Sequence, residues 1–176
     1  MAVYQLDPWL FEDPEAVGRY TLFYTGATRL ARNILEEVVD GYNSMNPASL
    51  FTVRRIGALA DAARDAFSLR DIDRLAWVVR ESWKENRLIH PSTTNAEIDE
   101  MLAAPGVAEN YQAMKLLGAG GGGYAFFISE SMEAAERLRD GLEAWAAGRA
   151  SSRTDGHGAR VVELSLNRAG LQVTVS

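Results

Sequence analysis

A glycine-rich segment between two apolar runs constrains the fold of this 176-residue chain more than any other feature. Glycine occupies five of the six positions at 118–123, and runs of mainly apolar residues precede and follow them. Apolar runs of this length bounded by glycine predict buried strands. Because glycine lacks a Cβ, it adopts positive φ and allows another backbone or a phosphate to approach closely. The segment therefore predicts a strand, a glycine loop and a second strand.

Two interpretations of this loop stay open. In the first it is a loose hairpin turn, although a tight hairpin needs only one or two glycines. In the second it contacts a phosphate site, because successive backbone N–H groups can surround an anion. The segment is not a P-loop, since no Gly-Lys-Ser/Thr follows it. It also leads into a strand, whereas a dinucleotide-binding fingerprint leads into a helix.

Composition excludes several classes of protein. A content of 47% hydrophobic and 24% charged residues predicts one globular domain with a sizeable core. The net charge of −6 argues against a nucleic-acid surface, which would be basic. The chain has no cysteine, and its two histidines lack the spacing of metal ligands, so no disulfide and no metal site are expected. No signal peptide or membrane-spanning run is apparent, so we expect a cytoplasmic protein without a membrane partner.

Hydrophobic periodicity and turn residues predict a mixture of helices and strands. The predicted strands are 2–6, 20–24, 113–117, 124–128 and a hairpin of 160–166 with 171–175, and the predicted helices are 29–42, 49–67, 71–89, 96–103 and 132–147. Ser49 and Asn95 are predicted to be helix N-caps. Trp83 and Tyr124 are predicted to lie in the core. This mixture indicates an α+β fold.

Three segments resemble one family of enzymes. Residues 116–124 (LLGAGGGGY) resemble the third signature motif of the GHMP kinases, the family of galactokinase, homoserine kinase, mevalonate kinase and phosphomevalonate kinase. Residues 24–35 resemble a strand-to-helix segment of the L-fucokinase and heptose 7-phosphate kinase branch. Residues 83–87 and 93–95 are similar to a helix end and a loop of L-fucokinases. The resemblance implies a ferredoxin-like α+β sandwich, with an antiparallel sheet and helices packed on one face.

The same resemblance implies only part of a kinase. A complete GHMP kinase carries a substrate-facing motif, a Pro-x-x-x-Gly-Leu-Gly-Ser-Ser loop around the ATP phosphates, a Mg²⁺ ligand and a catalytic Asp in its first half, and none of these is in residues 1–176. We therefore expect a single C-terminal domain of an ATP-dependent sugar kinase, inactive alone, with no catalytic residue or metal ligand of its own. ATP and Mg²⁺ are the implied cofactors of the complete kinase. The implied partners are an N-terminal kinase half and a sugar.

Candidate site residues follow from the resemblance. The loop residues are expected to pack against the phosphate-binding loop and to support the triphosphate site: Gly118, Ala119, Gly120, Gly121, Gly122 and Gly123. The polar groups of Thr93, Thr94 and Asn95 either face the sugar or only cap a helix. Thr28 is a helix cap or a substrate contact. The Arg29 guanidinium either binds a sugar or phosphate oxygen or is solvated.

A different class of function stays open beside the kinase. The same sandwich can serve as a non-catalytic regulatory module that binds a small metabolite or dimerises through its sheet, so a homodimer is possible. Nucleic-acid binding by the sheet is disfavoured, because the basic and aromatic pattern of such domains is missing. Apolar exposure discriminates between the classes, since a domain taken out of a two-domain kinase exposes an apolar face at its former interface.

Overall fold

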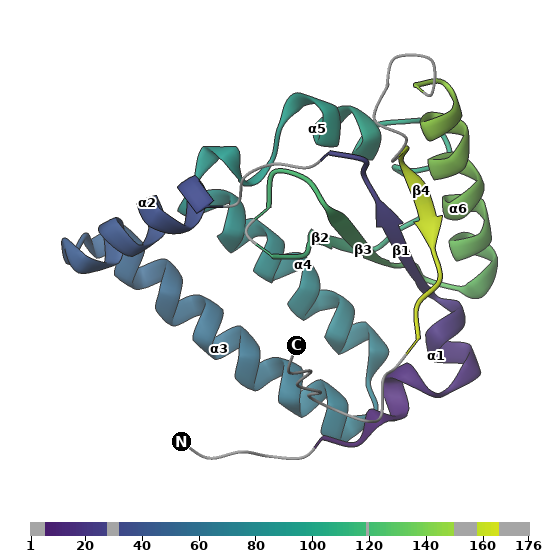
Figure 1. The fold of residues 1–176 in the computed structure, drawn as a ribbon. Coiled ribbons are helices and arrows are strands. Elements are labelled where there is room, and N and C mark those ends of the chain that lie inside the picture. Colours follow the sequence, from purple (N-terminus) through teal and green to yellow (C-terminus); the bar gives the residue numbers. More distant parts are fainter. Residues whose placement is uncertain (1–5, 28–31, 119, 150–157, 166–176) are drawn as a thin grey trace, which may run out of the picture.

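The computed structural model describes residues 6–27, 32–118, 120–149 and 158–165. In chain order the elements are η1 (Pro8–Phe11), α1 (Pro14–Gly18), β1 (Tyr20–Tyr24), α2 (Arg32–Asn43), α3 (Pro47–Leu69), α4 (Ile72–Ile89), η2 (Pro91–Thr93), α5 (Ala96–Leu102), β2 (Ala113–Leu116), β3 (Tyr124–Ile128), α6 (Met132–Ala147) and β4 (Arg160–Val162) (Figure 1). The four described strands form one antiparallel sheet in the order β2-β3-β1-β4. The predicted α+β class is confirmed.

Strand register places the glycine loop at one end of the sheet. Strands β2 and β3 pair with Leu116 opposite Ala125, so the loop connects two neighbouring antiparallel strands. Strand β1 pairs with β3, and Tyr24 at its end lies opposite Tyr124. The segment that leaves β1 and the loop between β2 and β3 therefore meet at the same end of the sheet, although they are far apart in sequence.

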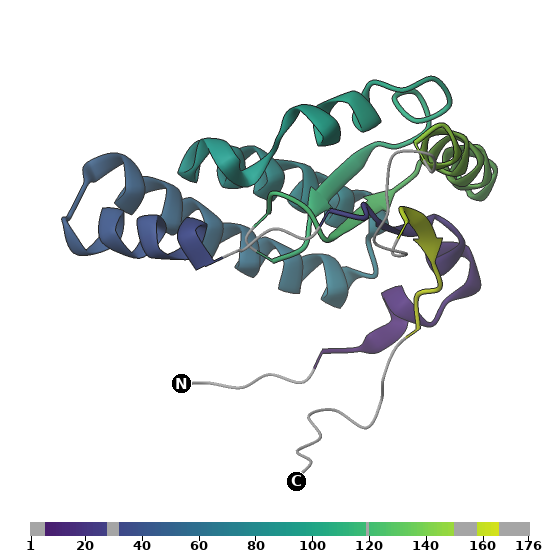
Figure 2. The same cartoon turned by 45° about the horizontal axis from the view of Figure 1, so that its top comes forward.

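One face of the sheet forms a core with α5 and α6. Side chains alternate along a strand, so Phe23, Ala125 and Phe127 share this face. They cluster with buried residues of the two helices, which are Ile98, Met101, Leu138 and Leu142. Helix α6 lies along β1 and β4, as Figures 1 and 2 show. Trp83 of α4 belongs to the same buried cluster, which confirms its predicted core position.

Helices cover the opposite face most fully toward the other end of the sheet. There Tyr20, Ala113 and Ile128 join a second buried cluster. Its helical members come from η1, α1, α3 and α4, and they are Leu10, Ala16, Ala66, Leu75, Ala76 and Val79. The sequence predicted helices on one face of the sheet, and the structure has helices on the second face as well. Helix α2 and the beginning of α3 extend away from the sheet (Figures 1 and 2).

Most predicted helix boundaries are confirmed, and one cap is wrong. Helix α4 is capped by Asp71, whose side chain accepts a hydrogen bond from a first-turn amide, and it ends before Pro91 as predicted. Helix α3 begins earlier than the predicted Ser49 cap. The side chain of Asn46 accepts hydrogen bonds from the Ala48 and Ser49 amides instead. Pro47 takes the first helical position, where its fixed φ fits and no N–H is needed.

Several predictions lie outside the described residues. They concern the strand at 2–6 apart from Leu6, the first residues of the 29–42 helix with its Thr28 cap, and the second arm of the 160–166 and 171–175 hairpin. The first arm, predicted as 160–166, is confirmed only over β4 (Arg160–Val162), because 163–165 are not in a strand and 166 lies outside the described residues. Among the described residues, no helix is both long and apolar enough to cross a membrane.

Tyr20 provides a pH-dependent test of the second buried cluster. Its hydroxyl is buried and has no hydrogen-bond partner among the residues that the structure describes, and burial raises the pKa of Tyr20 from 10.0 to about 12. Because the folded state holds this proton longer than the unfolded state, stability should be intact below pH 10 and fall as the pH rises from 10 to 12. Tyr20→Phe should abolish this loss of stability at alkaline pH. It should also raise the free energy of unfolding at neutral pH by about 1 kcal/mol, because it removes a buried hydroxyl without a partner among the described residues. Urea unfolding across the alkaline range measures both effects, and a variant that declines in parallel with the wild type would contradict them.

Candidate functional site

The glycine loop meets two other segments that the sequence had singled out. The Gly121 amide donates a hydrogen bond of 2.7 Å to the Thr93 carbonyl in η2. The Gly123 amide donates one of 2.8 Å to the Ala27 carbonyl after β1. In return, the amide and hydroxyl of Thr25 donate to the Gly123 carbonyl at 2.8 and 3.0 Å. The structure therefore joins residues 25–27, 93–95, 118 and 120–123 into one backbone-rich surface, which we call the loop junction.

Close backbone contacts explain two of the glycines within this chain itself. A Cβ on Gly120 would lie 2.6 Å from the Thr93 carbonyl oxygen, and its φ is +89°. A Cβ on Gly122 would lie 2.6 Å from the Ala27 carbonyl oxygen, and its φ is +154°. Gly118 and Gly123 also have positive φ, but a Cβ there would meet none of the described residues within 4 Å. The first pair is required by internal packing, whereas the second pair leaves space that no described residue fills.

The Thr-Thr-Asn segment is held by the chain's own hydrogen bonds. Asn95 caps α5, because its Oδ1 accepts from the Ile98 amide at 3.0 Å, and this prediction is confirmed. Its Nδ2 donates to the Gly121 carbonyl at 3.0 Å, so the same side chain also holds the glycine loop. The Thr94 hydroxyl donates to Asp99 Oδ1 at 2.9 Å, and Thr93 is buried. A contact of these residues with a sugar stays a prediction.

Two substitutions separate the roles of Asn95. Asn95→Asp keeps an oxygen for the Ile98 amide but faces the Gly121 carbonyl with a carboxylate, which cannot donate. Asn95→Ala removes both hydrogen bonds. We expect Asn95→Ala to lower the free energy of unfolding by about 2 kcal/mol. If the hydrogen bond to Gly121 contributes to stability, Asn95→Asp will lower the free energy of unfolding by at least half as much as Asn95→Ala does, as measured by urea unfolding. An Asp variant as stable as the wild type would show that only the cap matters.

Tyr124 is exposed, so its predicted core position is wrong. It lies at the end of β3 on the face that the helices of the second buried cluster do not reach, and 41% of its surface is exposed. Its ring contacts that of Tyr24 at an angle of 50°, with the centroids 5.3 Å apart. The guanidinium of Arg160 lies 5.1 Å from the Tyr24 ring centroid. Leu117, which also borders the glycine loop, is exposed as well.

Lys115 is a residue near the loop that sequence reasoning did not select. It lies on β2, and its Nζ donates to Ser82 Oγ of α4 at 3.2 Å. Partial burial lowers the pKa of the Lys115 ammonium. The signal that could have identified it is a single charge inside the apolar run that leads into the glycine loop.

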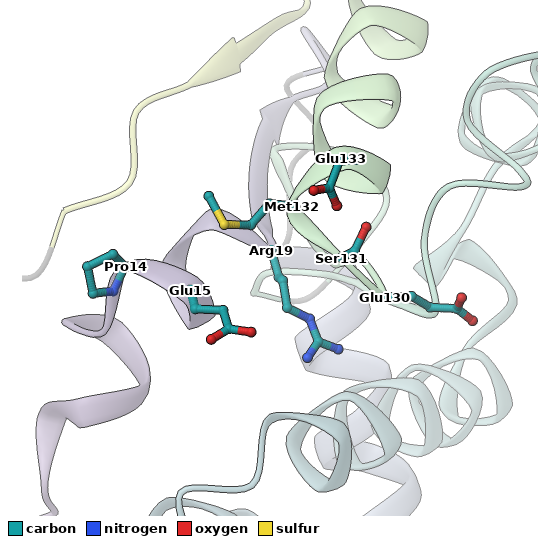
Figure 3. A pocket seen from close by; sticks show the side chains of 7 residues that line it. All are labelled: Pro14, Glu15, Arg19, Glu130, Ser131, Met132 and Glu133. Carbon is teal, nitrogen blue, oxygen red and sulfur yellow. The ribbon is translucent and has the colours of Figure 1, made fainter.

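A cavity of about 490 Å³ lies at the opposite end of the sheet (Figure 3). It is lined by Pro14, Glu15, Arg19, Glu130, Ser131, Met132 and Glu133. Arg19 is engaged elsewhere, because it donates to Asp73 at 2.6 Å and to the Ser129 carbonyl at 2.9 Å. The glutamates in this lining would repel a phosphate. The cavity is therefore a poor phosphate site, and the loop junction remains the candidate.

Some predicted site residues cannot be placed. Thr28, Arg29 and Ala119 lie outside the described residues. Thr28 and Arg29 directly follow Ala27, which takes part in the loop junction. Within the described ranges no group of three or more His, Cys, Asp and Glu could hold a metal ion.

Comparison with known proteins gives relatives of one kind. No protein-family model matches the sequence. The bifunctional fucokinase/GDP-fucose pyrophosphorylase of Arabidopsis thaliana is 29% identical over 126 residues, which are 71% of this chain and 12% of that protein. The L-fucokinase/L-fucose-1-P guanylyltransferase of Bacteroides fragilis is 28% identical over 167 residues, which are 95% of this chain and 16% of that protein. The chain thus spans less than a fifth of the length of these curated relatives.

Solved structures share the fold. Mevalonate kinase of L. major in complex with R-mevalonate has a TM-score of 0.58 at 18% identity, over 71% of this chain and 38% of the kinase. A protein from Campylobacter jejuni assigned as a sugar kinase has a TM-score of 0.55 at 18% identity, over 94% of this chain and 40% of its own. These likenesses show that the chain shares its fold with part of such kinases, over about two fifths of their length. In sequence the chain is similar to the fucokinases.

Proposed function

We propose that the chain is the C-terminal domain of an ATP-dependent sugar kinase similar to L-fucokinase, which transfers a phosphoryl group from ATP to a sugar hydroxyl. The observation that carries this proposal is the loop junction with exposed Leu117 and Tyr124 beside it. A preorganised backbone surface bordered by exposed apolar side chains suits contact with another folded part of the kinase. The fucokinase relatives support the choice of a sugar as substrate.

In this proposal the glycine loop acts by positioning. Phosphoryl transfer needs little covalent chemistry from the protein, and most of the rate comes from placing and stabilising the phosphates. The open space beside Gly118 and Gly123 would receive the backbone of a phosphate-binding loop from another part of the kinase. Thr28 and Arg29 are candidate contacts for the sugar or a phosphate, because they follow the loop junction directly.

The proposal places the catalytic groups elsewhere in the kinase. A kinase of this class uses ATP with Mg²⁺, and the described residues provide no cluster that fits a metal ion. In the proposal, the metal ligands and the catalytic base belong to the rest of the kinase, as the resemblance to GHMP kinases implies. The chain alone is expected to be inactive, and the complete kinase is expected to act in the cytoplasm.

A chimera tests the proposal. The 167-residue segment of the Bacteroides fragilis relative that matches this chain is replaced by this chain, and its guanylyltransferase activity reports whether the chimera is intact. We expect L-fucose-dependent ADP formation by the chimera and none by the isolated chain. In the chimera, Leu117→Asp should lower the kinase rate at least about tenfold, because it charges the proposed contact surface. Leu69→Asp, a distant exposed position on α3, is the control and should not lower it.

Two results would overturn the proposal. Turnover by the isolated chain would show that no other part is needed. A chimera with full guanylyltransferase activity but no kinase activity with any sugar would show that the domain does not serve in a sugar kinase.

A further inference from the structure

The side chain of Thr25 connects the end of β1 to the glycine loop. Thr25 follows the last residue of β1 and is only 1% exposed. Its Oγ1 donates a hydrogen bond to the Gly123 carbonyl at 3.0 Å and accepts one from the Ala27 amide at 3.3 Å. The Thr25 amide donates to the same Gly123 carbonyl, and the Gly123 amide donates to the Ala27 carbonyl. Thr25, Ala27 and Gly123 are thus held together by hydrogen bonds, and we call this group the Thr25 clamp.

The Thr25 clamp acts at the point where strand pairing ends. The register of β1 with β3 ends one residue before Thr25, and Gly26 then turns the chain with a φ of +72°. Beyond the paired strands, the clamp is what holds Ala27 against the glycine loop. The Ala27 carbonyl oxygen is also the atom that a Cβ on Gly122 would approach to 2.6 Å. The position of Ala27 therefore sets the close approach between the two segments of the loop junction.

A second threonine of β1 gives a direct comparison. Thr21 is 2% exposed, so it is as deeply buried as Thr25. Its hydroxyl has no hydrogen-bond partner among the residues that the structure describes. The hydroxyl of Thr25 instead bonds backbone groups of two segments that are far apart in sequence. A buried hydroxyl that is bonded in this way fixes the relative position of the two segments, in addition to filling space in the core.

We propose that Thr25 is a positioning residue for phosphoryl transfer, which holds the glycine loop and the segment after β1 in the arrangement that the complete kinase needs. This inference rests on the proposed function, in which the glycine loop supports the phosphate site and Thr28 and Arg29 are candidate contacts that directly follow Ala27. Thr25 itself is too deeply buried to touch a substrate. Because a small displacement of positioning groups lowers the rate steeply, loss of the clamp should act on kcat more than on KM.

Three substitutions in the chimera described above test this role. Thr25→Val keeps the shape of the side chain but removes its hydroxyl, whereas Thr25→Ser keeps the hydroxyl. Thr21→Val is the matched control, because it removes a buried hydroxyl that bonds no described residue. We expect Thr25→Val to lower kcat at least about tenfold, with a smaller change in the KM values for ATP and L-fucose. Thr25→Ser should restore most of the rate, and Thr21→Val should not lower it.

Hydrogen exchange of the 176-residue chain tests the clamp without any substrate. Thr25→Val should speed exchange of the Gly123 amide at least about fivefold, because two adjacent hydrogen bonds are lost. Amides in the middle of α6, such as that of Leu138, should accelerate less, because they report unfolding of the whole domain. Thr21→Val should speed neither.

The outcomes separate this inference from the proposed function. An unsubstituted chimera without kinase activity would overturn the proposed function. An active chimera in which Thr25→Val leaves kcat unchanged would overturn only the role of Thr25. The same conclusion would follow if Thr25→Ser lost as much activity as Thr25→Val, or if Thr25→Val left exchange of the Gly123 amide unchanged.

Discussion

Gly120→Ala is expected to destabilise the protein by about 3 kcal/mol, the largest effect of any change in the glycine loop. Two causes act together. The residue has a φ of +89°, which an L side chain adopts only with strain, and its new Cβ would lie 2.6 Å from the Thr93 carbonyl oxygen. That oxygen belongs to backbone that also accepts the hydrogen bond from Gly121, so it cannot move away without breaking the loop junction. Urea unfolding measures the loss as a change of midpoint at constant slope.

Gly118→Ala is the matched control for this prediction. Gly118 has a similar φ of +79°, but a Cβ there would meet no atom of the described part of the chain within 4 Å. The control therefore isolates backbone strain, for which we expect a loss of about 1 kcal/mol. If both variants lose the same free energy of unfolding, the close contact between the glycine loop and Thr93 does not exist in solution.

Phe127→Ala is expected to lower the free energy of unfolding by about 4 kcal/mol, because it leaves a cavity in the core between the sheet and α6. Phe127 is fully buried, and its ring packs edge-on against Tyr111 with the centroids 5.4 Å apart. The neighbouring buried residues include Leu138 and Leu142 of α6, which would border the cavity. Thermal and urea unfolding should give the same loss if unfolding is two-state.

Tyr124→Ala, on the same strand, is the matched comparison for Phe127→Ala. Tyr124 is exposed on the opposite face and touches Tyr24, so its removal should lower the free energy of unfolding by only about 1 kcal/mol, the value of one aromatic pair. Equal losses for Phe127→Ala and Tyr124→Ala would mean that both faces of β3 are buried at this end. The result would then favour the sequence-based core position of Tyr124 over the one in the structure.

Local sequence patterns determined most of the secondary structure. Strands β1, β2 and β3 and helices α4, α5 and α6 lie within about two residues of their predicted ranges, because apolar periodicity and capping side chains act over a few neighbouring residues. The Asn95 cap was predicted in this way, and Asp71, predicted as the beginning of the helix, is the N-cap of α4. The resemblance of residues 116–124 to a kinase motif was also visible in the sequence, and the relatives support it.

Contacts between distant segments were decided only by the tertiary structure. The sequence alone could not show that Gly120 is required by Thr93 and Gly122 by Ala27, because each pair meets only after the sheet has formed. The same holds for the second hydrogen bond of Asn95. The exposure of Tyr124 depends on where α3 and α4 stop covering the sheet, and no local pattern encodes that limit. Chain neighbours set φ, caps and periodicity, whereas burial and close approach are set by which segments the fold brings together.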